Sequence, residues 1–108
     1  MAWALLLGAS VLEVAWAVGL PFTEGFTRPW PSVLVGVGLI ASFVLLARAA
    51  ESISIGTAYA TWTGIGAAGT ALLGMILLDE PTSPARVASL VTIVLGVVGL
   101  RAFDSERR

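Results

Sequence analysis

The 108-residue sequence contains no cysteine, no histidine and no lysine, and charged residues make up only 12% of it. The lack of cysteine excludes disulfides and thiolate metal sites. The six basic residues are all arginines, which stay charged in proteins. Apart from the N-terminal amine, no group therefore has an ordinary pKa near neutrality. A side chain that takes up and releases protons near pH 7 must therefore be a carboxylate.

Hydrophobic residues are abundant in the chain. Apolar residues make up 57% of the chain, against about 45–50% in soluble domains, and the charged share is half of the usual value of about 25%. This composition predicts an integral membrane protein. The net charge of −1 gives no sign of a nucleic-acid partner. We expect neither enzymatic activity nor a bound metal or cofactor.

The charged residues divide the sequence into four apolar blocks. A membrane-spanning helix needs about 20 residues. The fourth block is the shortest, but Arg86 and Arg101 can extend from its ends to the membrane surface. Ser83 and Pro84 suit the start of that helix, as a capping hydroxyl followed by a proline. The predicted helices cover residues 2–20, 30–48, 53–78 and 84–103.

The connections between the blocks are short, so residues 1–108 are expected to form a single four-helix transmembrane domain with a polar tail at 104–108. We predict a multi-pass protein of the cytoplasmic (inner) membrane. Its orientation stays open, because the loops carry equal numbers of arginines on the two sides and only the tail favours cytoplasmic termini. A cleavable signal peptide is disfavoured, because the first block lacks a basic start and is interrupted by Glu13.

Glu13 is the only charged residue in the first apolar block. A charge at the centre of a membrane helix costs about 2.5–3.5 kcal/mol even on the mildest scale. Sequences keep such a group mainly where it binds a cation or a proton. Glu13 is therefore the leading candidate for a substrate-binding and proton-binding residue.

Polar and aromatic residues at helical spacing surround this position. Ser10 and Trp16 share the predicted face of Glu13. A carboxylate with hydrogen-bond donors and aromatic walls suits an organic cation, and a guanidinium could use both carboxylate oxygens. Ordinary packing is the alternative for the aromatic residues. The predicted pocket residues are Ser10, Trp16, Ser42, Tyr59, Trp62 and Thr63.

Small residues suggest how the helices meet. Gly64 and Gly66, near the middle of the third block, permit either a bend or close packing. Ser89 and Gly96 form a small-residue seam suited to contact between copies. Four helices of this length cannot easily enclose a solvated path, so we expect an oligomer that brings two copies of Glu13 together.

Several segments resemble the small multidrug resistance transporters: Glu13–Trp16, Thr23–Arg28, Trp30–Ser32 and Gly56–Gly66. The resemblance covers nearly the whole chain. It implies four helices per subunit in an antiparallel, dual-topology homodimer. It also implies proton-coupled antiport in which Glu13 of both subunits binds substrate and protons in turn. The third helix would kink at Gly64 and Gly66, and the fourth helices would form much of the dimer contact.

Within that family, Trp16, the run at residues 62–67 and Glu80-Pro81 look like the guanidinium-exporter subtype. This implies export of guanidinium and small guanidinyl cations, with Trp16, Ser42, Tyr59 and Trp62 flanking Glu13. The chain departs from the subtype at Ser10, where glycine is usual, and at Pro21, where lysine is usual.

Because of Ser10, a broad-specificity exporter of quaternary ammonium and other drug cations stays open as the alternative. A non-transporting membrane assembly subunit is less favoured, since that function would not explain a charged residue, Glu13, within a membrane helix. The full set of site residues favours a homodimer over a heterodimer with a paired homologue.

Overall fold

The computed structural model describes residues 1–103, which are helical almost throughout. The four helices are each long and apolar enough to cross a membrane. This confirms the predicted all-α, four-helix membrane fold. The predicted polar tail, 104–108, lies outside the described residues. The elements are α1 (Ala2–Gly19), the short 3-10 helix η1 (Leu20–Thr23), α2 (Pro29–Ala49), α3 (Ile55–Leu77) and α4 (Pro84–Phe103).

The helix boundaries follow from local sequence. Proline at the first helical position costs no hydrogen bond, and both α2 and α4 begin at a proline. Ser83 caps α4 as predicted, because its hydroxyl accepts a hydrogen bond of 3.2 Å from the backbone N–H of Arg86. Helix α3 begins at Ile55, two residues beyond the predicted start at residue 53. The reason is a turn after α2, in which the N–H of the fully buried Ile53 bonds to the carbonyl of Ala49 at 3.0 Å.

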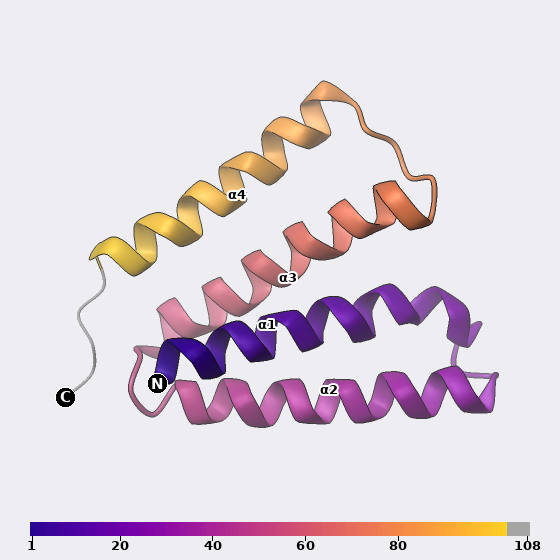
Figure 1. Ribbon diagram of the computed structural model, residues 1–108, viewed down its shortest axis with the longest axis horizontal. Helices are drawn as coiled ribbons and strands as arrows, with labels where there is room; N and C mark the ends of the chain where they lie inside the picture. Colours follow the sequence, from indigo (N-terminus) through magenta and orange to yellow (C-terminus); the bar gives the residue numbers. More distant parts are fainter. Residues whose placement is uncertain (104–108) are drawn as a thin grey trace.

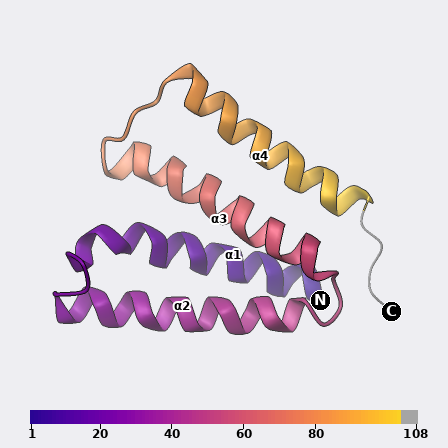
Figure 2. The same cartoon turned by 180° about the vertical axis from the view of Figure 1, so that it is seen from behind.

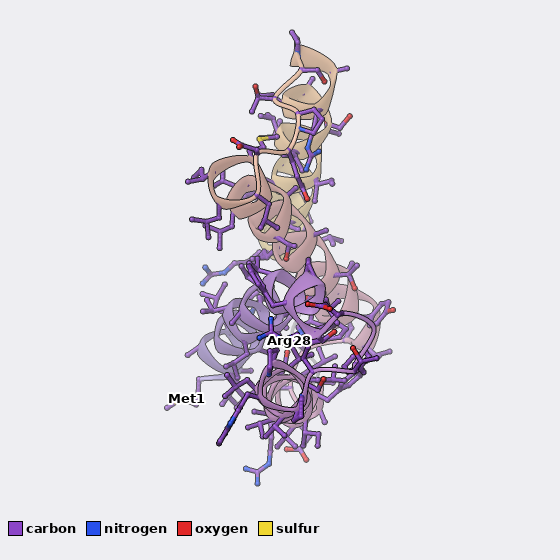
Figure 3. All side chains as sticks on the ribbon, turned by 90° about the vertical axis from the view of Figure 1, so that its right-hand side faces the viewer. Met1 and Arg28 are labelled. Carbon is purple, nitrogen blue, oxygen red and sulfur yellow. The ribbon has the colours of Figure 1, made fainter. Side chains whose placement is uncertain are left out.

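The helices lie side by side in the order α2, α1, α3, α4, as the two broad views show (Figure 1, Figure 2). The extents of the molecule are 44 × 34 × 17 Å. A helix with its side chains is about 10–12 Å across. The protomer is therefore about one and a half helix diameters thick. Seen along the layer, mainly carbon side chains project from the ribbon on both sides (Figure 3).

The core lies where the first half of α1, the end of α2 and the start of α3 meet. Its buried residues are Leu6, Ala9, Leu46, Ala49, Ile53, Ala58 and Trp62. Helix α4, all of which is described, contributes no buried residue. It packs on α3 at Gly64, where an added Cβ would lie 2.8 Å from Cγ2 of Val97. The first three helices thus form one packed unit, to which α4 is attached along one side.

Candidate functional site

The side chain of Glu13 extends from the middle of α1 toward α3. It lies against Gly66 so closely that a Cβ added there would overlap the carboxylate. The Oε1 atom of Glu13 is buried and has no hydrogen-bond partner within residues 1–103. The absence of a side chain at Gly66 therefore provides the space that the carboxylate occupies.

A chain of hydrogen bonds joins the three core helices one turn away from Glu13. The indole N–H of Trp62 donates to the hydroxyl oxygen of Ser42 at 2.9 Å. That hydroxyl in turn donates to the backbone carbonyl of Ala9 at 2.7 Å. All three residues are buried. Buried polar groups with satisfied hydrogen bonds fix the relative positions of the elements that carry them.

The remaining predicted pocket residues on α3 flank this chain unequally. The Tyr59 ring is tilted against that of Trp62, with centroids 5.8 Å apart, and the Tyr59 side chain is exposed. Phe43 of α2 contacts the same indole at a centroid distance of 5.0 Å. Thr63 lies on the exposed side of α3. The structure therefore brings Ser42, Tyr59 and Trp62 together and leaves Thr63 apart from them.

Ser10 is fully buried, and its hydroxyl donates to the carbonyl of Leu6 in the same helix at 2.9 Å. The hydroxyl is thus engaged with α1 itself and not with the carboxylate of Glu13. The extra oxygen at this position fills space in the core and adds no donor to the site within the protomer.

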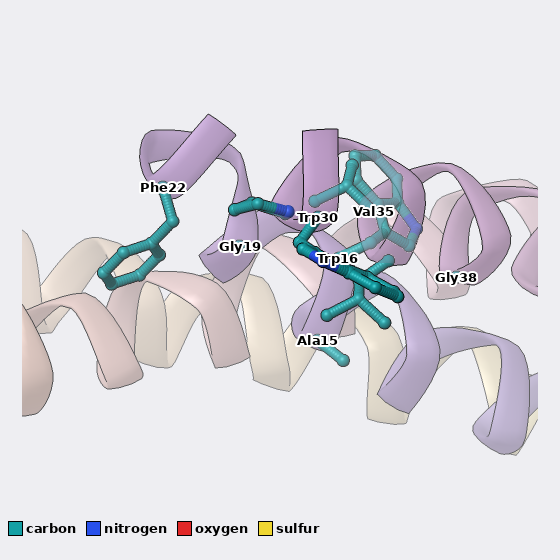
Figure 4. A pocket seen from close by; sticks show the side chains of 9 residues that line it. Ala15, Trp16, Gly19, Phe22, Trp30, Val35 and Gly38 are labelled. Carbon is teal, nitrogen blue, oxygen red and sulfur yellow. The ribbon is translucent and has the colours of Figure 1, made fainter. Parts of the chain in front are cut away.

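Trp16 faces a different neighbour from Glu13. It packs on α2, where a Cβ added at Gly38 would lie 3.2 Å from the Trp16 Cβ. Its ring lines a cavity of about 420 Å³ between α1, α2 and η1, together with Phe22 and Trp30 (Figure 4). The indole N–H of Trp16 is buried without a partner in the described part of the chain. Within one protomer, Glu13 thus faces α3 while Trp16 faces α2.

Three of the five glycines of α3 each lie against a different neighbour. The helix is continuous from Ile55 to Leu77. Gly64 lies against α4, Gly66 against Glu13, and Gly69 against Val14, whose Cγ2 would be 2.6 Å from an added Cβ. Close packing therefore accounts for all three positions, and the predicted hinge at the first two stays a prediction.

Sequence reasoning missed two hydroxyls. Thr61 and Thr70 on α3 each have a buried Oγ1 without a hydrogen-bond partner among the described residues. Threonine in a helix usually bonds to a carbonyl in the preceding turn. No sequence pattern separates the bonded hydroxyls from the unbonded ones, so only the structure identifies these two.

The predicted contact residues of α4 lie on the surface of the protomer. Ser89 and Gly96 are both exposed, and no atom lies within 4 Å of a Cβ added at Gly96. The hydroxyl of Ser89 donates to the carbonyl of Ala85 at 2.9 Å, so it adds no unpaired polar group to this surface. A contact between copies through this seam stays a prediction.

The charges of the described residues leave Glu13 without a counterion. The ion pairs there are Arg28–Glu24 at 3.8 Å and Arg86–Glu80 at 2.6 Å, and both lie at the ends of helices. The described residues also contain no group of three or more acidic, histidine or cysteine side chains that could hold a metal ion. The site can therefore accept a proton or a cation with N–H donors.

Known proteins resemble the chain along most of its length. Residues 1–93 match the family described as Small Multidrug Resistance protein. A protein named guanidinium exporter from Escherichia coli (strain K12) is 54% identical over 101 residues, which cover 94% of this chain and 96% of the relative. Proteins of the same name from Citrobacter freundii and Salmonella typhimurium are each 50% identical over the same shares of both chains. The chain is a multi-pass membrane protein and, as its sequence segments predicted, it belongs to the small multidrug resistance family.

Proposed function

We propose that the protein exports guanidinium and small guanidinyl cations across the cytoplasmic membrane in exchange for protons. Glu13 binds the cation and the proton in turn. The observation that carries this proposal is the carboxylate of Glu13, which lies in a membrane helix with a buried oxygen and no partner within residues 1–103. The relatives named guanidinium exporter support the substrate class.

The chemistry of the site fits such an exchange. A guanidinium can donate two parallel hydrogen bonds to one carboxylate, which a quaternary ammonium cannot do. The rings of Tyr59 and Trp62 offer π faces close to each other, and each such face attracts a cation. Protonation of Glu13 removes the charge that holds the cation. Proton and substrate therefore compete for one group, which is the basis of antiport.

The protein acts as an antiparallel homodimer in this proposal. A layer about one and a half helix diameters thick cannot surround Glu13, and α4 buries none of its residues within the protomer. A second copy would cover one face of the layer and bring a second Glu13 to the same space. The exposed seam of Ser89 and Gly96 gives the two α4 helices a surface for close contact.

The direct test is guanidinium uptake into proteoliposomes under a proton gradient. Glu13→Gln keeps the size of the side chain but cannot exchange a proton, so we expect it to abolish coupled uptake. Glu24→Gln is the matched control, because it removes the same charge from an exposed loop position. In the unaltered protein, the apparent KM for guanidinium should rise as the pH falls, since protons then compete more strongly for Glu13.

Full transport by Glu13→Gln would contradict the proposed mechanism. A KM that did not depend on pH would show that proton and cation use different groups. The same preparation separates the alternatives. Larger transport currents for a bulky quaternary ammonium ion than for guanidinium would favour the broad-specificity exporter. An unaltered protein that moved no cation would favour the non-transporting assembly subunit.

A further inference from the structure

A second cavity that contains polar groups lies at the opposite end of α1 from Phe22 and Trp30. It encloses about 440 Å³ where the start of α1, the first half of α3 and the last turns of α4 meet. Neither Glu13 nor Gly66 lines it. Its walls include Trp3, Leu7, Thr61, Ile65, Val98 and Arg101.

Arg101 supplies a positive charge at the mouth of this cavity. Its guanidinium carbon lies 5.1 Å from the centroid of the Trp3 ring, in a cation–π contact between α4 and α1. A guanidinium carries five N–H donors, so such a contact with one ring can leave donors for an anion. Arg101 forms no ion pair with any residue of 1–103. Arginine and tryptophan near helix ends are typical of the membrane–water interface, so the mouth lies at the level of the lipid headgroups.

Thr61 lies deeper in the wall of the same cavity and carries a hydrogen-bond donor. Its side chain is fully buried, and its Oγ1 has no partner in the described part of the chain. It lies six positions after the first residue of α3, and thus about 9 Å along the helix from that end. The hydroxyl is thus placed below the headgroup level, where a phospholipid carries its ester carbonyls.

We propose that this cavity binds one anionic phospholipid. The phosphate contacts the guanidinium of Arg101, and an ester carbonyl accepts a hydrogen bond from the hydroxyl of Thr61. The first part of one acyl chain lies against Leu7, Ile65 and Val98. Three properties of the site match this class of molecule: a charge at the interface, a buried donor below it, and apolar walls that continue into the membrane.

The site is compatible with a dimer that uses the other face of α4. At 3.6 residues per turn, Val98 and Arg101 lie on the side of α4 nearly opposite to Ser89 and Gly96. A second copy that covers the small-residue seam would therefore leave the lipid in place. The lipid site does not include Glu13, so its test does not depend on cation transport.

Native mass spectrometry of the purified protein, titrated with lipid in detergent, tests the proposal. The probes are dioleoylphosphatidylglycerol, which is anionic, and dioleoylphosphatidylcholine, which has the same chains and no net charge. We expect the anionic lipid to bind about fivefold more tightly, the contribution of one arginine near the headgroups. Arg101→Gln should remove this preference. Thr61→Val should weaken the binding of both lipids by about threefold, because one neutral hydrogen bond is lost.

Arg48→Gln is the matched control, because Arg48 is an exposed arginine at the end of α2 that does not line the cavity. It should keep the full lipid preference. Equal binding of the two lipids by the unaltered protein, or an equal loss in Arg48→Gln and Arg101→Gln, would overturn the proposal. Competition by inorganic phosphate at the concentration of the lipid would also overturn it, in favour of a free anion. Should Arg101→Gln fail to fold, Arg101→Lys keeps the charge and should keep the preference.

Discussion

Gly66→Ala is the substitution that most directly tests how α3 makes room for the carboxylate of Glu13. The added Cβ would overlap that carboxylate in the observed arrangement, and no other side chain lies among its three nearest contacts. The group that must move is thus the far end of a flexible side chain. At Gly64, by contrast, the obstacle is Cγ2 of Val97, on a branched side chain in a packed contact.

This difference sets the expected magnitudes. Alanine stabilises a helix interior by about 1 kcal/mol relative to glycine. The carboxylate of Glu13 can swing away at little cost, so Gly66→Ala should change the free energy of unfolding by no more than about 1 kcal/mol. Transport should respond far more strongly, because displacing a binding group by about 1 Å can reduce turnover about 100-fold. We expect a loss of at least about tenfold in kcat/KM for guanidinium.

The assay pairs guanidinium uptake into proteoliposomes with thermal unfolding in detergent. Gly36→Ala is the control, since Gly36 lies inside α2 and a Cβ added there meets no atom within 4 Å. It should keep its activity and gain up to about 1 kcal/mol of stability, the ordinary effect of alanine in a helix interior. Uptake by Gly66→Ala equal to that of the control would refute the reasoning, because the carboxylate would then not need the space at Gly66. A large loss of stability would refute it as well, since the added Cβ would then strain the packing of the helices.

The hydrogen-bond chain and the α3–α4 connection give two further predictions. Ser42→Ala leaves the buried indole N–H of Trp62 unpaired and should cost about 1–3 kcal/mol of stability, seen as a lower thermal midpoint. Ser32→Ala, which removes an exposed hydroxyl bonded within its own helix, should change the midpoint little. A double-mutant cycle with Glu80→Gln and Arg86→Gln should give a coupling energy of about 0.2–1 kcal/mol, because both side chains are partly exposed.

Each of these predictions has a result that contradicts it. An unchanged midpoint in Ser42→Ala would show that the bond from Trp62 does not hold the helices together. For the ion pair, the comparison is a cycle on Glu24 and Arg28, which are more exposed and 3.8 Å apart. Coupling in that pair equal to or larger than that of Glu80 and Arg86 would mean that the lower exposure of Glu80 and Arg86 does not strengthen their interaction.

The fold could be predicted from the sequence because the charges and prolines coincide with the ends of the helices. Ser83 and Pro84 marked the start of α4. Helix α2 begins at Pro29, directly after Arg28 and one residue before the predicted start. In a membrane chain of this length each apolar block has only one structural solution, a spanning helix. The start of α3 was less predictable, because the turn before it depends on the buried Ile53, whose environment a sequence does not show.

The candidate site was predictable in its central residue but not in its contacts. Glu13 stands out by energy alone, since no other charge interrupts its helix. The neighbour that each side chain faces depends on helix packing, and α1 is apolar on nearly all sides. Periodicity therefore placed Trp16 with Glu13, whereas the structure turns Trp16 toward α2. By its position in the sequence, the hydroxyl of Ser10 could donate to the carboxylate or to a backbone carbonyl. The structure shows that it donates to the carbonyl of Leu6.

The separation of α4 from the core has a consequence for biosynthesis. All residues of the buried core cluster lie between Leu6 and Trp62, so none of them belongs to the last helix. During translation the N-terminal part of a chain becomes available for folding first. We therefore expect α1, α2 and α3 to pack in the membrane while α4 is still being made. The last helix then joins a finished unit, and its insertion can proceed without disturbing the surroundings of Glu13.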